Sequence, residues 1–278
     1  MNASAALLPF DVRPAHRETL DSYSNRLLAA NFCDDAHRKD LSRTFASGRS
    51  ADAMREGWMR ALTTKTKRTT LHLTPDLASR LFDGRSECTH FQNTLPRRFA
   101  CTHCTHGATV EQYPHFDDIV CIRHGRWTGL WTHADHQQQT TPDAVKAQIL
   151  FAKLRRKNLI DVRLYLLTTK ALAHALHPSL PIEQAEPLVF PLVIGLIHAI
   201  TADSFARRFF DPALPFTDAH SHLDAVVTAT IGHASPTVVR SLWIYMHPTV
   251  LTLNNAILLN TPHTADWVHD YPLRPRTA

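Results

Sequence analysis

Three cysteines and a histidine in the middle of the chain are the residues best able to do chemistry. Cys101 and Cys104 are separated by two residues, and after sixteen further residues the same spacing recurs at Cys121 and His124. Two ligands at this spacing can turn back onto one metal ion, and two such knuckles complete the tetrahedron that Zn²⁺ prefers. The spacing therefore predicts a zinc site. Because protein fills all four positions, the site would be structural, and metal binding would stabilise the fold.

Two glycines support this site, while other potential ligands nearby leave the identity of the four ligands open. Gly107 follows the first knuckle and Gly125 the second, where the chain must turn tightly around a metal. Cys88 is the main competing ligand, and it could also form a second site with His90 and one neighbouring histidine. Unmetallated core cysteines are disfavoured because the segment is polar. The nearby candidates are Cys88, His90, His103, His106 and His115.

The clustered cysteines and the apolar segments together predict in which cellular compartment the protein resides. The N-terminal residues lack the pattern of a secretory signal, so clustered cysteines favour metal binding over disulfides and predict an intracellular, cytoplasmic protein. The most apolar run spans residues 188–202 and contains Pro191 and His198. It is shorter than the roughly 20 residues that a membrane span needs. We expect no membrane span, and a buried core helix that begins near Pro191.

One motif raises the alternative of a metal-dependent enzyme. His220 and His222 form an H-x-H pair like the one that opens amidohydrolase barrels, where alternate residues of a strand face one ion. Such a strand precedes a barrel of roughly 250 residues, whereas the sequence continues only to Ala278. Phosphate-binding glycine loops and nucleophile elbows are absent from the sequence. We therefore predict no catalytic activity and expect a helix near Asp218.

Helical periodicity on both sides of the metal-binding stretch divides the chain into three parts. These are a helical N-terminal region (1–85), a zinc-binding module (86–136) and a helical C-terminal domain (137–278), with a polar linker over 133–143. Capping signatures include Thr19, Thr141 before Pro142, and Ser235 before Pro236. The predicted helices span 17–32, 51–62, 74–82, 142–157, 160–177, 183–209, 218–232 and 236–259.

Positive charge is concentrated near the N-terminus. The formal net charge is +5, and residues 38–68 hold nine Lys or Arg against three acidic residues. Such a stretch is compatible with a polyanionic partner, although a solvated helix face is the favoured interpretation of any single charge run. Residues 51–82 are the first place where a helix-turn-helix is expected. The run of Lys153, Arg155, Arg156 and Lys157 could add phosphate contacts, but ordinary helix-surface charge is the favoured interpretation.

Two stretches resemble the TniQ family, whose members act in target selection by Tn7-like and mercury-resistance-type transposons. The second stretch is the zinc module, which in the family is a C-x2-C knuckle, an aromatic-bearing hairpin and a C-x2-H-G knuckle. Thr102 stands where the family usually has a proline. The first stretch is an opening motif, matched here by Glu18, Thr19, Leu20, Ser22, Tyr23, Arg26 and Leu27.

The resemblance implies a mainly α protein with a central zinc-knuckle module that contains a short β-hairpin. It also implies a non-enzymatic adaptor that binds DNA or a DNA-targeting complex and recruits a transposition ATPase or transposase. A homodimer is compatible with this role, and alternatives are a stand-alone DNA-binding regulator of a phage or mobile element, or a protein scaffold. The expected phosphate contacts are Arg123, Arg126, Lys65, Lys67 and Arg68.

Overall fold

The computed structural model describes residues 8, 10, 12–15, 18–66, 98–112, 116–211 and 214–258, with the backbone alone over 252–258. The fold is mainly helical with short strands in the middle of the chain, as predicted. Contacts divide the chain into two compact units. The first unit contains residues 1–115 and 133–135, and the second contains residues 116–132 and 136–278. The predicted boundaries after residues 85 and 136 remain predictions.

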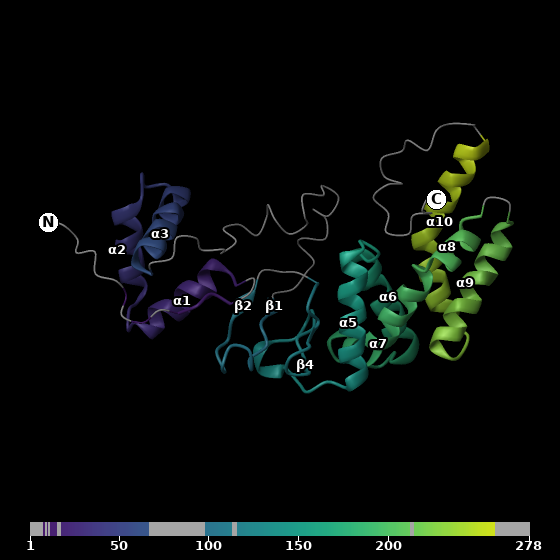
Figure 1. Cartoon of the computed structure of the whole chain (residues 1–278), viewed down its shortest axis with the longest axis horizontal. Coiled ribbons are helices and arrows are strands. Elements are labelled where there is room, and N and C mark those ends of the chain that lie inside the picture. The colour runs from purple at the N-terminus through teal and green to yellow at the C-terminus, as the bar shows by residue number, and fades with distance from the viewer. Residues whose placement is uncertain are drawn as a thin grey trace. The chain divides into compact units, whose positions relative to one another are not determined.

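The first unit begins with three helices, α1 (Leu20–Ala30), α2 (Asp35–Phe45) and α3 (Ala51–Lys65). Figure 1 shows α2 and α3 side by side. The hydroxyl of Thr19 caps α1, as predicted, by accepting a hydrogen bond from the Ser22 N–H. The buried core of the three helices combines one face of α1 with one face of α3: Leu20, Tyr23, Leu27, Leu28, Trp58, Ala61 and Leu62.

The structure adds one helix to the predicted set in this unit. The α2 helix was not predicted, and it starts with a capping box in which Asp34 and His37 bond reciprocally. The predicted helix over 74–82 lies outside the described residues. The α2 and α3 backbones approach closely at Gly57, where a Cβ atom would lie 2.3 Å from the Ser42 carbonyl oxygen. This contact explains why a glycine interrupts the periodic pattern of α3.

Two short antiparallel hairpins follow. The first pairs β1 (Arg98–Phe99) with β2 (Glu111–Gln112), and the second pairs β3 (Val120–Cys121) with β4 (Arg126–Trp127). The predicted short hairpin is thus confirmed, and the described residues contain two of them. A 3₁₀ turn, η2 (Ala134–His136), lies in the tract that was predicted to be a linker.

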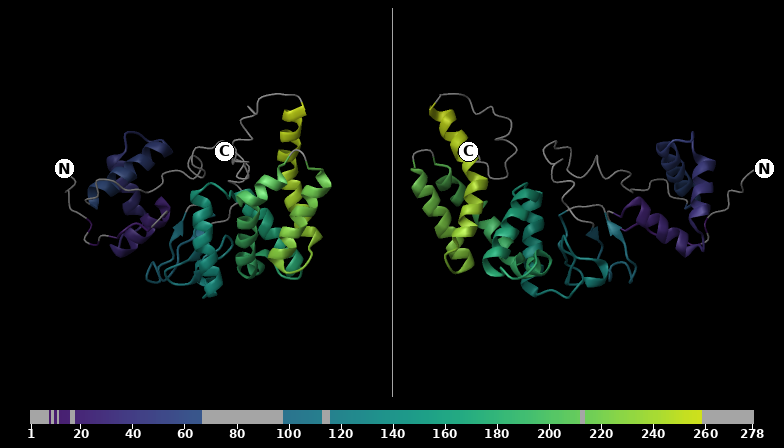
Figure 2. Two further views of the ribbon diagram at one scale, coloured as in Figure 1. Left: turned by 45° about the vertical axis from the view of Figure 1, so that its right-hand side comes forward. Right: turned by 180° about the vertical axis from the view of Figure 1, so that it is seen from behind.

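Six helices build most of the second unit. They are α5 (Pro142–Arg156), α6 (Val162–Leu176), α7 (Ile182–Ile200), α8 (Asp203–Phe209), α9 (Phe216–Ile231) and α10 (Pro236–Leu258). The α7 helix packs against α5, α6 and α9, and Figure 2 shows α10 alongside α9. The predicted caps at Thr141 and the proline starts of α5 and α10 are confirmed.

The observed bounds of α7 differ from the predicted bounds in two ways. The start predicted near Pro191 is wrong, because the helix begins at Ile182 and contains Pro187 and Pro191, whereas the start of the helix predicted over 183–209 agrees with the structure to within one residue. The single helix predicted over 183–209 is divided into α7 and α8 at Thr201 and Ala202. The Thr201 hydroxyl donates to the Ile197 carbonyl at this break, which satisfies a helix-end acceptor.

Among the described helices, α7 alone is long and apolar enough to cross a bilayer by length and composition. Its side chains Val189, Phe190, Val193 and Ile194 are completely buried, and it lies against three other helices. A central core helix has this same composition, because it is covered on several sides.

Candidate metal centre

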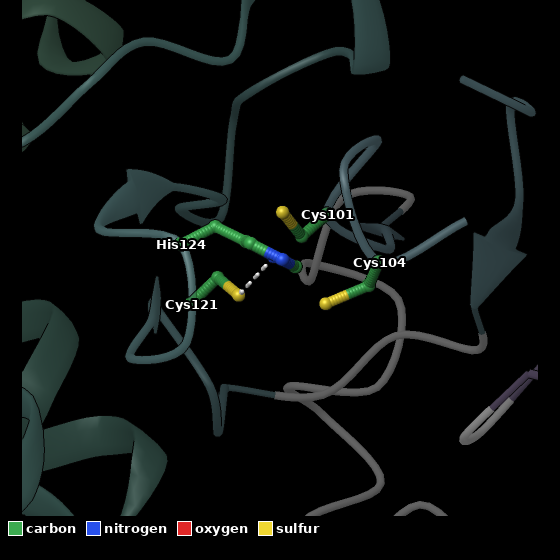
Figure 3. Close-up of side chains that lie close together, drawn as sticks. All are labelled: Cys101, Cys104, Cys121 and His124. Carbon is green, nitrogen blue, oxygen red and sulfur yellow. Dashed lines mark hydrogen bonds between the residues drawn. The ribbon is translucent and has the colours of Figure 1, made fainter. Parts of the chain in front are cut away.

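Cys101, Cys104, Cys121 and His124 lie together and could hold a metal ion. Their ligand atoms are all within 4.8 Å of one another, and the Cys121 Sγ lies 3.6 Å from the His124 Nδ1. Figure 3 shows the four side chains converging. Cys101 is buried, Cys104 is exposed, and the other two are half-buried. In the part of the chain that the structure describes, this is the one group of three or more Cys, His, Asp or Glu so arranged.

The first ligand pair sits in the turn of the β1–β2 hairpin. The Thr105 N–H donates to the Cys101 carbonyl at 3.2 Å, and the Gly107 N–H donates to the Thr102 carbonyl at 2.8 Å. Gly107 has a φ of +87°, in the left-handed region that favours glycine. The predicted tight turn after Cys104 is therefore present. It brings two thiols spaced by two residues to the same side of the hairpin tip.

The second ligand pair sits in the turn between β3 and β4. The His124 N–H donates to the Cys121 carbonyl at 3.3 Å, and Gly125 has a φ of +58°. A Cβ atom at Gly125 would lie 2.8 Å from the end of the flexible Gln139 side chain, which could move aside, so the backbone conformation is the reason for this glycine. Away from the turn, the Val120 N–H donates to Gln148 Oε1 on α5 at 3.0 Å.

A buried carboxylate ties α1 to the hairpin that carries the first knuckle. Glu18 has a fully buried side chain and receives the Arg26 guanidinium through two bonds, from Nε at 2.7 Å and from NH2 at 2.6 Å. The Ser22 hydroxyl and the Ala15 N–H also donate to it. The Glu18 backbone in turn bridges to Gln112 of β2. The carboxylate is thus surrounded by donors, which offsets the cost of burying its charge.

Two further bonds fix the start of α1 against the same strand. The Thr19 N–H donates to the Glu111 carbonyl at 3.0 Å, and the Glu111 N–H donates to the Ser22 hydroxyl at 3.0 Å. The stretch that resembles the TniQ opening motif is therefore hydrogen-bonded to the hairpin of the first knuckle, within one unit. Its apolar members Leu20, Tyr23 and Leu27 are buried in the core of the helices.

The competing ligands remain outside this cluster. His103 and His106 are exposed beside the first knuckle and do not belong to the group of converging ligand atoms. Cys88, His90 and His115 lie outside the described residues, so the alternative second site stays a prediction. His106 has a φ of +52°, and it precedes Gly107 in the turn.

The predicted phosphate contacts fall into different environments. Arg123 is exposed between Cys121 and His124. Arg126 is half-buried and donates from NH2 to the Gln137 carbonyl, so part of its guanidinium already supports the loop after β4. Lys65 ends α3 in the first unit. Lys67 and Arg68 lie outside the described residues.

The H-x-H motif lies on a helix. His220 and His222 both belong to α9, where residues two apart point in different directions, so the strand geometry that presents both imidazoles to one ion is not formed. The His220 ring lies 5.1 Å from Trp243, and the His222 ring stacks on Phe205 at 5.1 Å. The α9 helix starts at Phe216, two residues before the position expected from the sequence.

In comparisons with known proteins, the chain matches no family model, no curated protein and no solved structure. The fold and the site are therefore interpreted from their own geometry.

Proposed function

We propose that the protein is a zinc-containing, TniQ-like targeting or recruitment factor of a mobile genetic element. In this role it binds DNA or a DNA-targeting nucleoprotein complex inside the cell and recruits transposition machinery, without catalysing a reaction itself. One observation carries the proposal. The two stretches that resemble the family are far apart in sequence, yet Glu18, Thr19 and Ser22 bond directly to the strand β2 that leads out of the first knuckle.

Zinc is the ion that suits the donor set. Three thiolates and one imidazole are typical of structural zinc sites, with Zn–S of about 2.3 Å and Zn–N of about 2.0 Å. A tetrahedron with those bond lengths has edges of about 3.5–3.8 Å. The 3.6 Å between Cys121 Sγ and His124 Nδ1 matches such an edge, and the upper limit of 4.8 Å requires only small movements of the other ligands. A filled set of four ligands supports a structural role.

The nucleic-acid part of the proposal rests on exposed positive charge. Arg123 projects from the second knuckle, and α2 and α3 together carry six Lys or Arg from Arg38 to Lys65. Three of these cations are in ion pairs on the helix surfaces, Arg38 with Asp21, Arg43 with Asp40 and Arg60 with Glu56. Exposed pairs of this kind are weak and can exchange a carboxylate for a phosphate. Contacts with phosphates would add sequence-independent affinity that decreases with salt.

DNA binding by the zinc-loaded protein tests the proposal. We expect affinity for duplex DNA to fall by at least about tenfold between about 50 mM and 200 mM salt, because each phosphate contact releases counterions. Arg123→Glu should weaken binding at every DNA sequence. Lys170→Glu makes the same change of charge at an exposed position of α6 outside the predicted contacts, and it should leave binding unchanged.

Recruitment is tested separately by co-purification with a transposition ATPase or transposase. No DNA binding at about 50 mM salt would contradict direct DNA contact. Absence of both DNA binding and co-purification would contradict the proposed function as a whole.

A further inference from the structure

A second site is suggested by a pocket in the helical second unit. The pocket has a volume of about 630 Å³ and lies where the C-terminal end of α5 meets the residues that join α7 to α8. Its size falls within the range of about 300–1,000 Å³ that is typical of small-molecule sites. Its lining combines positive charges at the edge with aliphatic side chains, namely Lys153, Arg156, Lys157, Leu150, Leu154 and Leu159.

The cations of this pocket differ from their neighbour Arg155. Arg155 donates to Asp117 at 2.8 Å, donates to the Ile160 carbonyl and lies 4.2 Å from the Phe116 ring, so its charge is used within the fold. Lys153, Arg156 and Lys157 are exposed, and none of them is in an ion pair within the described part of the chain. Arg156 donates only through Nε to the Ala152 carbonyl of its own helix. The run of four cations thus contains one structural arginine and three charges that face the pocket.

The simplest explanation for these cations is their position in the last turn of α5, which requires no ligand. Cations there favour the negative end of the helix dipole, and this effect needs no ligand. It does not explain why the same three residues border a pocket with an aliphatic wall. Leu154 is almost fully buried behind them, and Leu150 and Leu159 are half-buried. Amphiphilic ligands need this combination of a charged rim and an apolar wall.

We propose that this pocket binds a small organic phosphate. Lys153, Arg156 and Lys157 hold the phosphate group, and the apolar part of the ligand covers the leucines. In the described lining, three cations and the carboxylate of Asp203 leave an excess of two positive charges, which matches a phosphate monoester dianion. The Arg156 guanidinium offers the planar pair of donors that phosphate oxygens accept. His198 lines the same pocket and adds an imidazole to it.

The lining also limits the kind of ligand. Among the described residues that line it there is no Phe, Tyr or Trp, so they offer no aromatic platform on which a base could stack. Affinity should therefore depend on the phosphate and on apolar area more than on the identity of a base. A free phosphate ester and a phosphate of a nucleic-acid strand share the chemistry that this site recognises.

Calorimetric titration of the zinc-loaded full-length protein tests the site. The probes are phenyl phosphate, inorganic phosphate and benzyl alcohol. We expect phenyl phosphate to bind more tightly than inorganic phosphate, and benzyl alcohol not to bind, because both the charge and the apolar wall contribute. Replacing Lys153 and Arg156 together by Gln should weaken phenyl phosphate binding at least about tenfold, since charge-assisted bonds are lost.

Two further variants act as controls. Lys146→Gln removes a positive charge from the same helix, at a residue paired with Asp143 and outside the pocket, and it should keep the wild-type affinity. Arg156→Lys should retain part of the affinity, because the charge remains while the planar fork is lost. Circular dichroism and thermal unfolding establish that each variant is folded.

Competition identifies the source of the phosphate. If a short single-stranded oligonucleotide is displaced by phenyl phosphate, the pocket serves nucleic acid. If phenyl phosphate binds without displacing it, the ligand is a small molecule. The proposal is overturned if phenyl phosphate does not bind in the millimolar range, or if the double Gln variant binds it as tightly as Lys146→Gln does.

Discussion

Loss of the Arg26 side chain should open the first unit locally. In Arg26→Ala, two of the four bonds to the Glu18 carboxylate disappear, while those from the Ser22 hydroxyl and the Ala15 N–H remain. Removal of one partner of a buried ion pair costs about 3–5 kcal/mol, because the other charge stays buried without compensation. Since Glu18 keeps two donors and Arg26 is 21% exposed, we expect the lower limit, about 3 kcal/mol.

Hydrogen exchange of the α1 and β2 amides measures this effect where it occurs. A loss of about 3 kcal/mol corresponds to exchange that is about a hundredfold faster through local opening. Arg60→Ala is the matched control, because Arg60 pairs with Glu56 one helical turn away and both side chains are more than half exposed. That exposed pair should contribute less than about 1 kcal/mol.

Adding Glu18→Gln to Arg26→Ala should recover part of the lost protection, because the uncompensated charge is then removed. Equal exchange rates in Arg26→Ala and Arg60→Ala would refute this reasoning. They would mean that the buried carboxylate does not depend on its arginine.

Three other perturbations have defined outcomes. Cys121→Ser should reduce the zinc content in metal analysis and lower the unfolding temperature in calorimetry. Cys33→Ser changes a cysteine outside the cluster and should keep the metal. Full zinc content in Cys121→Ser would exclude the proposed ligand set. Gly57→Ala should lower the free energy of unfolding, measured in urea, by about 1–3 kcal/mol, because the Cβ of the alanine would meet the backbone of α2. This loss exceeds the gain of about 1 kcal/mol in helix propensity. A variant more stable than the wild type would contradict the close contact. Burial raises the pKa of Asp161 above its ordinary value of 3.8, so the folded state favours the protonated carboxyl. The resulting contribution to the free energy of unfolding is complete below pH 3.8 and is lost as pH rises through the raised pKa. Asp161→Asn should flatten the dependence of the unfolding temperature on pH, and an unchanged pH profile would contradict this expectation.

The helices that the sequence predicted well are those with both a cap and an apolar stripe. Thr19 before α1 and Thr141 before α5 are examples, because a local bond and a local period suffice to define them. The α2 helix was missed because it is strongly polar along its length. It depends instead on its capping box and on Leu41 and Phe45, which pack on the core of α1 and α3. That support comes from tertiary contacts that no local window contains.

Prolines misled one of the two predictions for the start of α7, the one near Pro191. A proline inside a helix removes one hydrogen bond and crowds the preceding turn, so Pro191 was expected to start the helix. In the structure the helix continues through Pro187 and Pro191. Its buried side chains, among them Val189, Phe190 and Ile194, pack against α5, α6 and α9, and this burial outweighs the local cost. Packing of that kind cannot be read from the segment alone.

The clustering of Cys101, Cys104, Cys121 and His124 was predictable because the knuckle spacing is local. The members of each pair are separated by two residues, and both pairs are followed by a glycine that the structure places at positive φ. The anchoring of the hairpins was not predictable in the same way. It depends on Ser22 meeting Glu111, and on Gln148 meeting Val120, across long stretches of sequence. The resemblance to a known motif identified Glu18 and Arg26 without giving the physical reason for them.

The small size of the hairpins gives a physical reason why a metal ion, as proposed, and the buried ion pair would both stabilise them. Strands of two residues each bury little surface, and isolated hairpins of that size are marginal in water. Each hairpin is held at its strands by a helix, through Glu18 and Ser22 of the first unit or through Gln148 of α5. Each also carries two residues of the candidate metal centre, so a bound ion would hold its turn. Metal removal should therefore increase exchange at the turns before it affects the strands, whereas Arg26→Ala should act on β2 first.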